Sequence, residues 1–296
     1  MAKVHLICFF ASYLVAFVLE LTRMLGQNRF SRFVMLGFGG AGFVAHTLYL
    51  LARSRASGLP PLLSSPHDWM LVLAWLLVLF YLFLTALHRE IALGLFMLPL
   101  VLALIAATRF MAVSPEPHFN ARNAWTMLHA SLLVFGMAGV VLGLIAGLMY
   151  LTQHHRLKSS HAAQFGWKMP SLERLAQFNR WSVMIAFPLL TLGFGIGVYL
   201  VVRPQQGPGH IGFNDPVVVA SSVLWGLLAV LFLWLLKHHH PSGRQVAWLT
   251  ICAFAFLLIA VVGLQVLSGS GLFHTETHTA TGEAKHRLLS RQESPA

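Results

Sequence analysis

Charged side chains are scarce in this sequence: Asp, Glu, Lys and Arg make up 10% of the 296 residues, whereas 57% are hydrophobic. Soluble domains carry about 25% charged residues, so the chain lacks the polar material to cover a surface that faces water. Its apolar residues come in blocks of about 20, the length of a helix that crosses a bilayer. These continuous blocks exclude a transmembrane β-barrel, whose strands alternate apolar and polar residues. The composition therefore predicts an all-α, polytopic integral membrane protein.

Acidic residues and cysteines are also few. Glu20 is the only acid within an apolar block, and we expect it to snorkel to the surface or to pair with Arg23. Cys8 and Cys252 differ too much in expected depth for a disulfide, and no C-x-x-C motif supports thiol exchange. Paired carboxylates, an activated nucleophile and a phosphate-binding loop are absent. The residues therefore favour an accessory binding or assembly protein over an enzyme, and they indicate no catalytic residue.

Eight apolar spans set the predicted organisation. They cover residues 4–22, 33–51, 69–87, 91–112, 125–152, 181–202, 217–236 and 247–267. No small-residue cleavage site follows the first span, so we interpret it as a retained helix and not as a signal peptide. We expect residues 1–274 to form a single transmembrane domain and the polar residues 275–296 to form a disordered tail.

Two stretches carry a finer pattern. Gly139, Gly143 and Gly147 recur at a spacing of four in the fifth span, and small residues at this spacing let helix backbones approach closely. The polar connection 153–180 contains "SLERLAQFNRW", with apolar residues at helical spacing. This pattern predicts a short amphipathic helix that lies along the membrane.

The net charge of +11 can be explained by the orientation of the chain in the membrane. Binding to nucleic acid is not needed to account for it. Basic residues concentrate in cytoplasmic loops, and with the N-terminus outside, eleven lie inside and six lie outside near the membrane. The inner ones are Arg23, Arg29, Arg32, Arg89, Arg156, Lys158, Lys168, Arg174, Arg180, Lys237 and Arg244, and the outer ones are Lys3, Arg53, Arg55, Arg109, Arg122 and Arg203. We therefore predict both termini on the outer side.

Histidine, in contrast, is abundant, with 16 residues. His129 opens the fifth span and His274 follows the eighth, so both are expected at the outer surface. A histidine at the edge of the hydrocarbon is costly unless it has a partner, and neutral imidazole is a common ligand of haem iron and other metals. The two could supply opposite axial ligands to one iron, with Arg122 near a haem propionate and Trp125 against the ring. Alternatively, each imidazole hydrogen-bonds a carbonyl at a helix end.

Four stretches in the same order resemble the cytochrome c assembly proteins of the CcsA/ResC and HemX-like type. "WTMLHASLLVFGMAGVVLGLIAGLMYLTQHHRLK" resembles the signature span, in which a histidine begins a helix that ends in Tyr-Leu and basic residues. "GFVAHTLYLLARSRASGLPPL" resembles the second helix, and "SLERLAQFNRWSVMIAFPLLTLGFGIG" the helix that leads to the haem-handling loop. "VVGLQVLSGSGLFH" resembles the last helix, which delivers a histidine to the outer face. The resemblance covers roughly residues 30–275.

The resemblance implies an eight-helix haem-handling protein of the bacterial inner membrane that binds haem of the b type. His129 and His274 match the two outer haem ligands, and His46 matches a histidine within the membrane. His238 is the nearest candidate for a second intramembrane ligand, although its expected depth differs from that of His46. The implied partners are the lipid bilayer and other membrane or periplasmic proteins of cytochrome c maturation or of a respiratory complex.

The sequence also departs from the family's synthases, whose haem-presenting loop reads W-x-W-D-P-K-E. Here "GPGHIGFNDPVVVASSVLW" keeps Asp215-Pro216, so Asp215 remains a candidate cofactor-binding residue, but it lacks the preceding tryptophans. An acidic, asparagine-bearing segment of the family is reduced to "SSPHDW". The shorter HemX-like branch fits better, as a haem-binding protein of cytochrome c maturation or haem handling. The alternatives are a haem b electron-transfer subunit of a membrane redox complex and a haem-free structural or assembly subunit.

Overall fold

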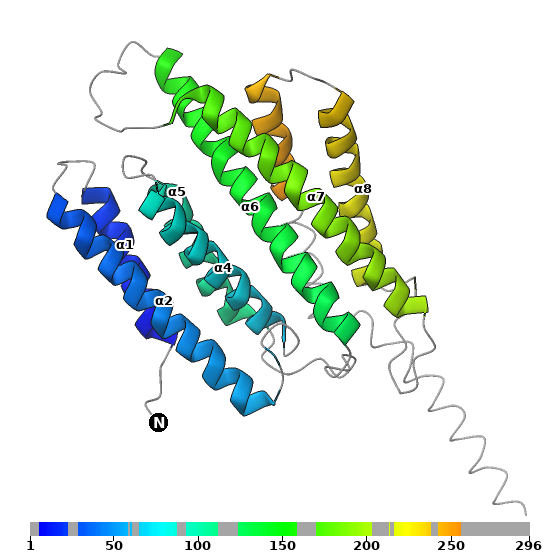
Figure 1. The fold of residues 1–296 in the computed structure, drawn as a ribbon, viewed down its shortest axis with the longest axis horizontal. Coiled ribbons are helices and arrows are strands. Elements are labelled where there is room, and N and C mark those ends of the chain that lie inside the picture. Colours follow the sequence, from blue (N-terminus) through cyan, green and yellow to red (C-terminus); the bar gives the residue numbers. More distant parts are fainter. Residues whose placement is uncertain are drawn as a thin grey trace, which may run out of the picture. The chain divides into compact units, whose positions relative to one another are not determined.

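The structure, a computed structural model, describes residues 6–22, 29–58, 60, 65–87, 93–111, 124–158, 170–202, 213, 216–237 and 242–255. Within these ranges the secondary structure is helical, and Figure 1 shows the long helices side by side. They are α1 (Leu6–Thr22), α2 (Arg29–Ser57), α4 (Pro66–Leu87), α5 (Gly94–Ala107) with the 3-10 turn η1 (Thr108–Phe110), α6 (Ala124–Lys158), α7 (Leu172–Val202) and α8 (Pro216–Lys237). A further helix occupies residues 243–255.

The predicted all-α membrane fold is confirmed. Among the described residues, five helices are long and apolar enough to cross a membrane, and α1 and α5 are shorter apolar helices. The described helix of the eighth span begins four residues before its predicted start, at residue 243. The rest of that span, and the predicted tail 275–296, lie outside the described residues.

The separate amphipathic helix predicted in the connection 153–180 is wrong. Its residues form the first turns of α7, which continues without a break to Val202. The backbone N–H of Leu175 donates to the Ser171 carbonyl, and Ser171 Oγ accepts from the N–H of Arg174, so the helix is capped at Ser171. No proline follows before Pro188, so nothing separates this segment from the sixth span.

Of the two outcomes predicted for Glu20, snorkelling to the surface is wrong, whereas Arg23, its predicted partner in the other, lies outside the described residues. Glu20 is 2% exposed and lies on the buried face of α1 with Phe9, Tyr13 and Ala16. A methyl group placed on Gly94 of α5 would lie 3.2 Å from Glu20 Cδ. The acid therefore packs against α5.

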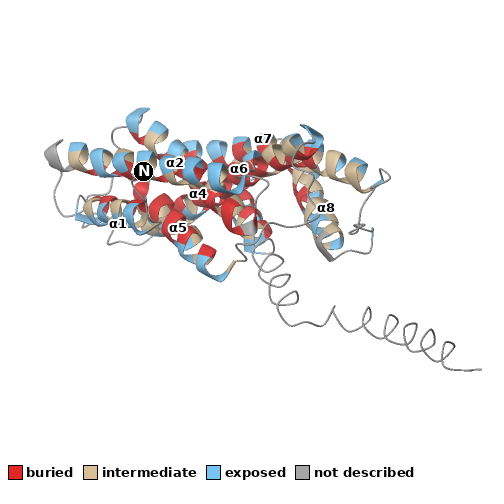
Figure 2. Cartoon of the chain, turned by 90° about the horizontal axis from the view of Figure 1, so that it is seen from below, coloured by how far each residue is buried: buried red, intermediate tan, exposed pale blue. Residues whose placement is uncertain are grey.

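The helix α6 is the most buried of the five long apolar helices, and Figure 2 shows the concentration of buried residues along it. It packs against α7, and it also contacts α4 and α5. The predicted close approach at its glycines is confirmed, since a methyl group on Gly139 would lie 2.8 Å from Ala186 Cβ of α7. The small residues let two helix backbones pack without an intervening side chain.

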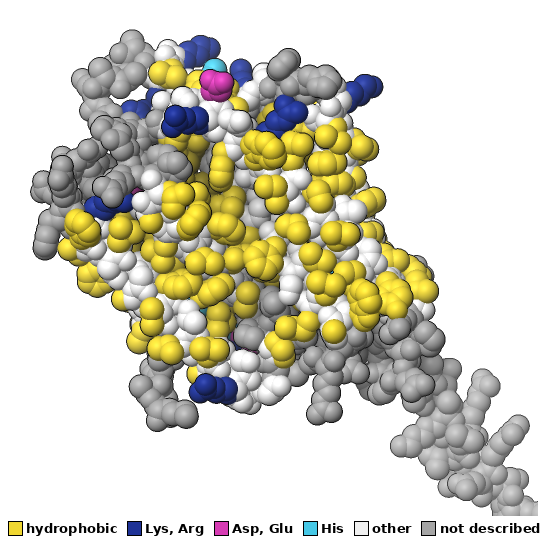
Figure 3. Space-filling model, viewed as in Figure 1, with side chains coloured by type: hydrophobic (Ala, Val, Ile, Leu, Met, Phe, Trp, Pro, Cys, Tyr) yellow, Lys and Arg dark blue, Asp and Glu magenta, His cyan; other side chains and the backbone are white. Residues whose placement is uncertain are grey.

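Basic side chains are distributed unevenly between the two ends of the helices. Figure 3 shows most Lys and Arg at one end and an apolar band below them. We call this the Arg156 end, after Arg156 in the last turn of α6. We call the opposite end, where α2 and α7 finish and α4 and α6 begin, the His129 end (Figure 1). Basic residues whose side chains are described number seven at the Arg156 end (Arg32, Arg156, Lys158, Arg174, Arg180, Lys237, Arg244) and three at the His129 end (Arg53, Arg55, Arg109).

Candidate functional site

His129 lies in the second turn of α6 and faces α7. Its Nδ1 atom is 2.7 Å from the carbonyl oxygen of Gly193. A carbonyl only accepts hydrogen bonds, so Nδ1 carries the proton and donates it. The lone pair of the neutral ring is then on Nε2, which makes no hydrogen bond to a described residue. Ligating histidines commonly have their second nitrogen fixed by a carbonyl or carboxylate in this way.

The space for this imidazole comes from glycines of α7. A methyl group on Gly197 would lie 2.7 Å from Cε1 of His129, which is too close for a carbon–carbon contact. Gly193, one turn earlier, supplies the carbonyl and packs against Leu133. Sequence reasoning did not identify these glycines as site residues. The signal was present as "GFGIG", residues 193–197.

Trp125 lies one turn before His129 on α6. This position agrees with the prediction that the two residues belong to one site. Its ring meets Tyr199 of α7 edge-on, with the ring centroids 5.6 Å apart. Trp125 keeps 45% of its surface exposed. The first turn of α6 and the last turn of α7 therefore form an aromatic edge next to His129.

His46 is fully buried between α1 and α2. Its ring stacks on Phe9, with the centroids 4.3 Å apart and the planes 1° from parallel, and its Nδ1 is 3.3 Å from the hydroxyl oxygen of Tyr13. Gly42 makes room for this tyrosine, because a methyl group there would lie 2.6 Å from Tyr13 Cε1. Nε2 of His46 has no hydrogen-bond partner among the described residues. A buried polar atom without a partner costs about 1–3 kcal/mol and calls for an explanation, of which a bound group is one.

The structure brings together only part of the predicted site. His129 and Trp125 share the His129 end, whereas His46 lies in a separate contact between α1 and α2. His274, His238, Arg122 and Asp215 lie outside the described residues. The two described histidines fit the axial ligation of a haem iron, because each has Nδ1 beside an oxygen and no hydrogen bond from Nε2 to a described residue.

The fold defines a multi-pass helical membrane protein. The chain belongs to the cytochrome C assembly protein family, whose profile matches residues 63–271. It is 29% identical over 131 residues to the cytochrome c biogenesis protein CcsA of Chlorella vulgaris, covering 43% of this chain and 41% of that protein. It is 27% identical over 142 residues to the protein HemX of Brevibacillus brevis, covering 46% of this chain and 49% of HemX. The matches thus span less than half the length of either relative. The family supports a role in cytochrome c maturation or haem handling.

Proposed function

We propose that this protein binds haem at the His129 end by axial histidine ligation and acts in cytochrome c maturation or haem handling. The observation that carries the proposal is the hydrogen bond from His129 Nδ1 to the Gly193 carbonyl, 2.7 Å long. It fixes the tautomer that leaves Nε2 free to bind a metal. The names of the two relatives, a cytochrome c biogenesis protein and HemX, support the same cofactor.

The residues of the chain have separate roles in this proposal. His129 and His274 are the axial ligands, Arg122 binds a propionate, and Trp125 covers one edge of the ring. His46, with its unpartnered Nε2, is the candidate ligand within the membrane. Haem of the b type supplies an iron with two axial positions that accept neutral imidazole. The roles of His238 and Asp215 stay proposals from the resemblance.

The His129 end faces outward in this proposal, and the protein lies in the bacterial inner membrane. The seven described basic side chains at the Arg156 end, against three at the His129 end, support a cytoplasmic Arg156 end. Haem at the outer surface is accessible to periplasmic proteins of cytochrome c maturation, which we propose as partners.

The experiment is a visible spectrum of the detergent-purified protein, oxidised and reduced, for wild type, His129→Ala, His274→Ala and the double variant. We expect the low-spin, six-coordinate signal of wild type to become five-coordinate in each single variant, and we expect the haem held between His129 and His274 to be lost in the double variant. His155→Ala, at the opposite end of α6, is the matched control and should keep the wild-type spectrum. A wild-type spectrum in the double variant would overturn the ligand assignment. A wild-type protein without any haem absorption would instead indicate a haem-free assembly subunit.

A further inference from the structure

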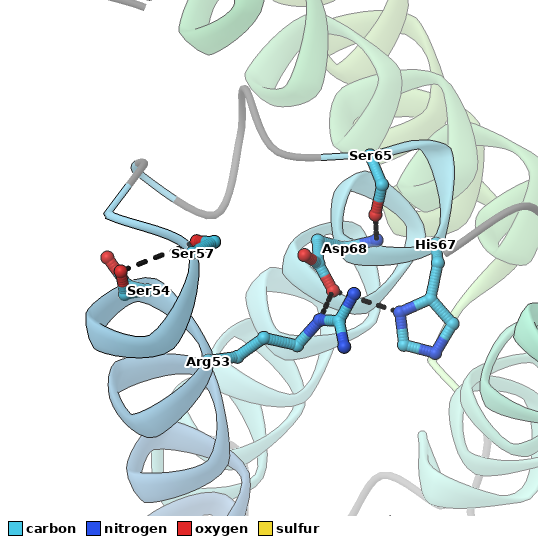
Figure 4. Close-up of polar contacts among 6 residues, drawn as sticks. All are labelled: Arg53, Ser54, Ser57, Ser65, His67 and Asp68. Atoms are coloured by element: carbon cyan, nitrogen blue, oxygen red, sulfur yellow. Dashed lines mark hydrogen bonds and ion pairs between the residues drawn. The ribbon is translucent and has the colours of Figure 1, made fainter. Parts of the chain in front are cut away.

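A second oriented histidine, which is not one of the predicted site residues, lies at the His129 end. Arg53 in the last turns of α2 and His67 in the first turn of α4 both contact Asp68 (Figure 4). His67 Nδ1 is 2.9 Å from Asp68 Oδ1, and Arg53 Nε forms an ion pair with the same oxygen. Figure 4 shows the contacts of the guanidinium and the imidazole meeting at this one carboxylate oxygen.

This cluster is held by several polar contacts and is mostly buried. The side chains of Asp68 and His67 are 2% and 8% exposed, and that of Arg53 is 26% exposed. Ser65 caps the helix, since its Oγ accepts from the Asp68 N–H at 3.2 Å and its carbonyl accepts from the Trp69 N–H at 3.0 Å. A carboxylate this buried needs a cation nearby, and Arg53 provides one. The Arg53–Asp68 pair therefore explains the charge, but it does not require a histidine at position 67.

The geometry determines which nitrogen of His67 is available. An ionised carboxylate only accepts hydrogen bonds, so the proton of the neutral imidazole is on Nδ1. The lone pair is then on Nε2, which makes no hydrogen bond to a described residue. A carboxylate partner also raises the basicity of a ligating imidazole. This is the arrangement of His129, with a carboxylate in place of the Gly193 carbonyl.

Both histidines lie where their helices begin. The helices α4 and α6 start at the same end of the molecule (Figure 1) and contact each other. We propose that His67, oriented by Asp68, is the single axial ligand of a second haem position at the His129 end, distinct from the position of His129 and His274. Arg53 is a positioning residue that pairs with Asp68. This inference rests on the proposed function. It adds a ligand, His67, that would bind a haem on its way into or out of the position between His129 and His274.

The test uses full-length protein in detergent, with haem added stepwise and the spectrum and bound fraction recorded. In the His129→Ala/His274→Ala background, we expect a residual five-coordinate haem signal. Adding His67→Gln should weaken its affinity at least about 10-fold, in line with the loss of a ligand or its orienting partner. Glutamine still offers an N–H to Asp68 but has no nitrogen lone pair for iron. Added imidazole should restore the signal in the corresponding His67→Ala protein.

Asp68→Asn separates ligation from a structural role. A weaker hydrogen-bond acceptor makes the imidazole less basic, so the reduction potential of the residual haem should rise while the haem stays bound. His155→Gln in the same background is the control and should change neither affinity nor potential. Equal haem binding with and without His67→Gln, or no residual haem in the double background, would overturn this inference alone. Absence of the low-spin signal in wild type would instead count against the proposed function.

Discussion

At the residue scale, the two described candidate histidines differ in what holds Nδ1. His129 faces a carbonyl, which only accepts, so its tautomer is fixed. His46 faces the Tyr13 hydroxyl, which either donates or accepts. When Tyr13 accepts from Nδ1–H, the lone pair of His46 is on Nε2 and can bind iron. When Tyr13 donates, a buried Nε2–H remains without a partner. A ligand on Nε2 would therefore select the first tautomer.

Gly197→Ala should perturb haem bound to His129. The new methyl group would lie 2.7 Å from His129 Cε1, so the ring must move and its hydrogen bond to Gly193 must lengthen. We expect a partial change from six- to five-coordinate haem and weaker binding, measured by spectral titration. Gly195→Ala is the matched control, since nothing lies within 4 Å of a methyl group there. Identical spectra for the two variants would show that this contact does not position the ring.

Tyr13→Phe should destabilise the protein through His46. Removal of the hydroxyl leaves both ring nitrogens without a described partner, at a cost of about 1–3 kcal/mol. The measurement is thermal unfolding in detergent without haem. Tyr49→Phe is the control, because Tyr49 also contacts Phe9 but its hydroxyl makes no hydrogen bond to a described residue. An equal loss of stability in the two variants would contradict a specific role for the Tyr13 hydroxyl.

At the element scale, apolar runs were enough to predict the helices but not their ends or their contacts. The apolar residues of "SLERLAQFNRW" recur at helical spacing. A separate surface helix and an N-terminal extension of α7 both predict this spacing, so the sequence could not distinguish between the two. The glycines of α6 predicted close packing, because small residues act through their size alone. Their partners Ala186 and Leu190 could not be predicted, since the register between two helices depends on side-chain packing along both.

The α6–α7 contact should be sensitive to single methyl groups. A methyl group on Gly136 would lie 2.5 Å from Leu190 Cγ and 3.2 Å from its backbone nitrogen. Gly136→Ala should therefore cost about 1–3 kcal/mol, the usual cost of overpacking, measured as the free energy of unfolding in mixed micelles. Gly226→Ala in α8, where nothing lies within 4 Å, should be close to neutral. If Gly136→Ala is equally stable, the two helices pack less tightly than the structure indicates.

The connection between α7 and α8 should not contribute to haem binding. It lacks the family's tryptophans, and Phe213, its described aromatic residue, is 59% exposed. We expect Phe213→Ala to leave the haem content of the purified protein nearly unchanged, with Trp125→Ala as the comparison that lowers it. A large loss of haem in Phe213→Ala would show that this connection is part of the site.

At the scale of the whole molecule, basic residues and oriented histidines divide between the two ends. The described residues place His129 and His67 at the end with fewer cations. The sequence predicted His129 because a histidine at a helix end is recognisable from the length of the apolar run. It did not predict His67 as a ligand, because the partnership with Asp68 and Arg53 joins two helices. In the proposed function, the orientation in the membrane decides which compartment exchanges haem with the protein.

The proposed orientation puts residues 203–216 outside and residues 153–180 inside. In a Cys8→Ser/Cys252→Ser background, cysteine at Gln205 should react with an impermeant thiol reagent in intact cells, whereas cysteine at Ser160 should react only after lysis. The removal of both native cysteines is necessary because both are exposed. Their side chains lie on apolar helices, so serine should be tolerated, and haem content checks that the fold is retained. The physical basis is that basic residues concentrate at the cytoplasmic side of membrane proteins. In this protein the described basic residues concentrate at the Arg156 end. The reverse labelling pattern would put His129 and His67 at the cytoplasmic face, and haem would then be bound on the side opposite to the periplasmic partners proposed here.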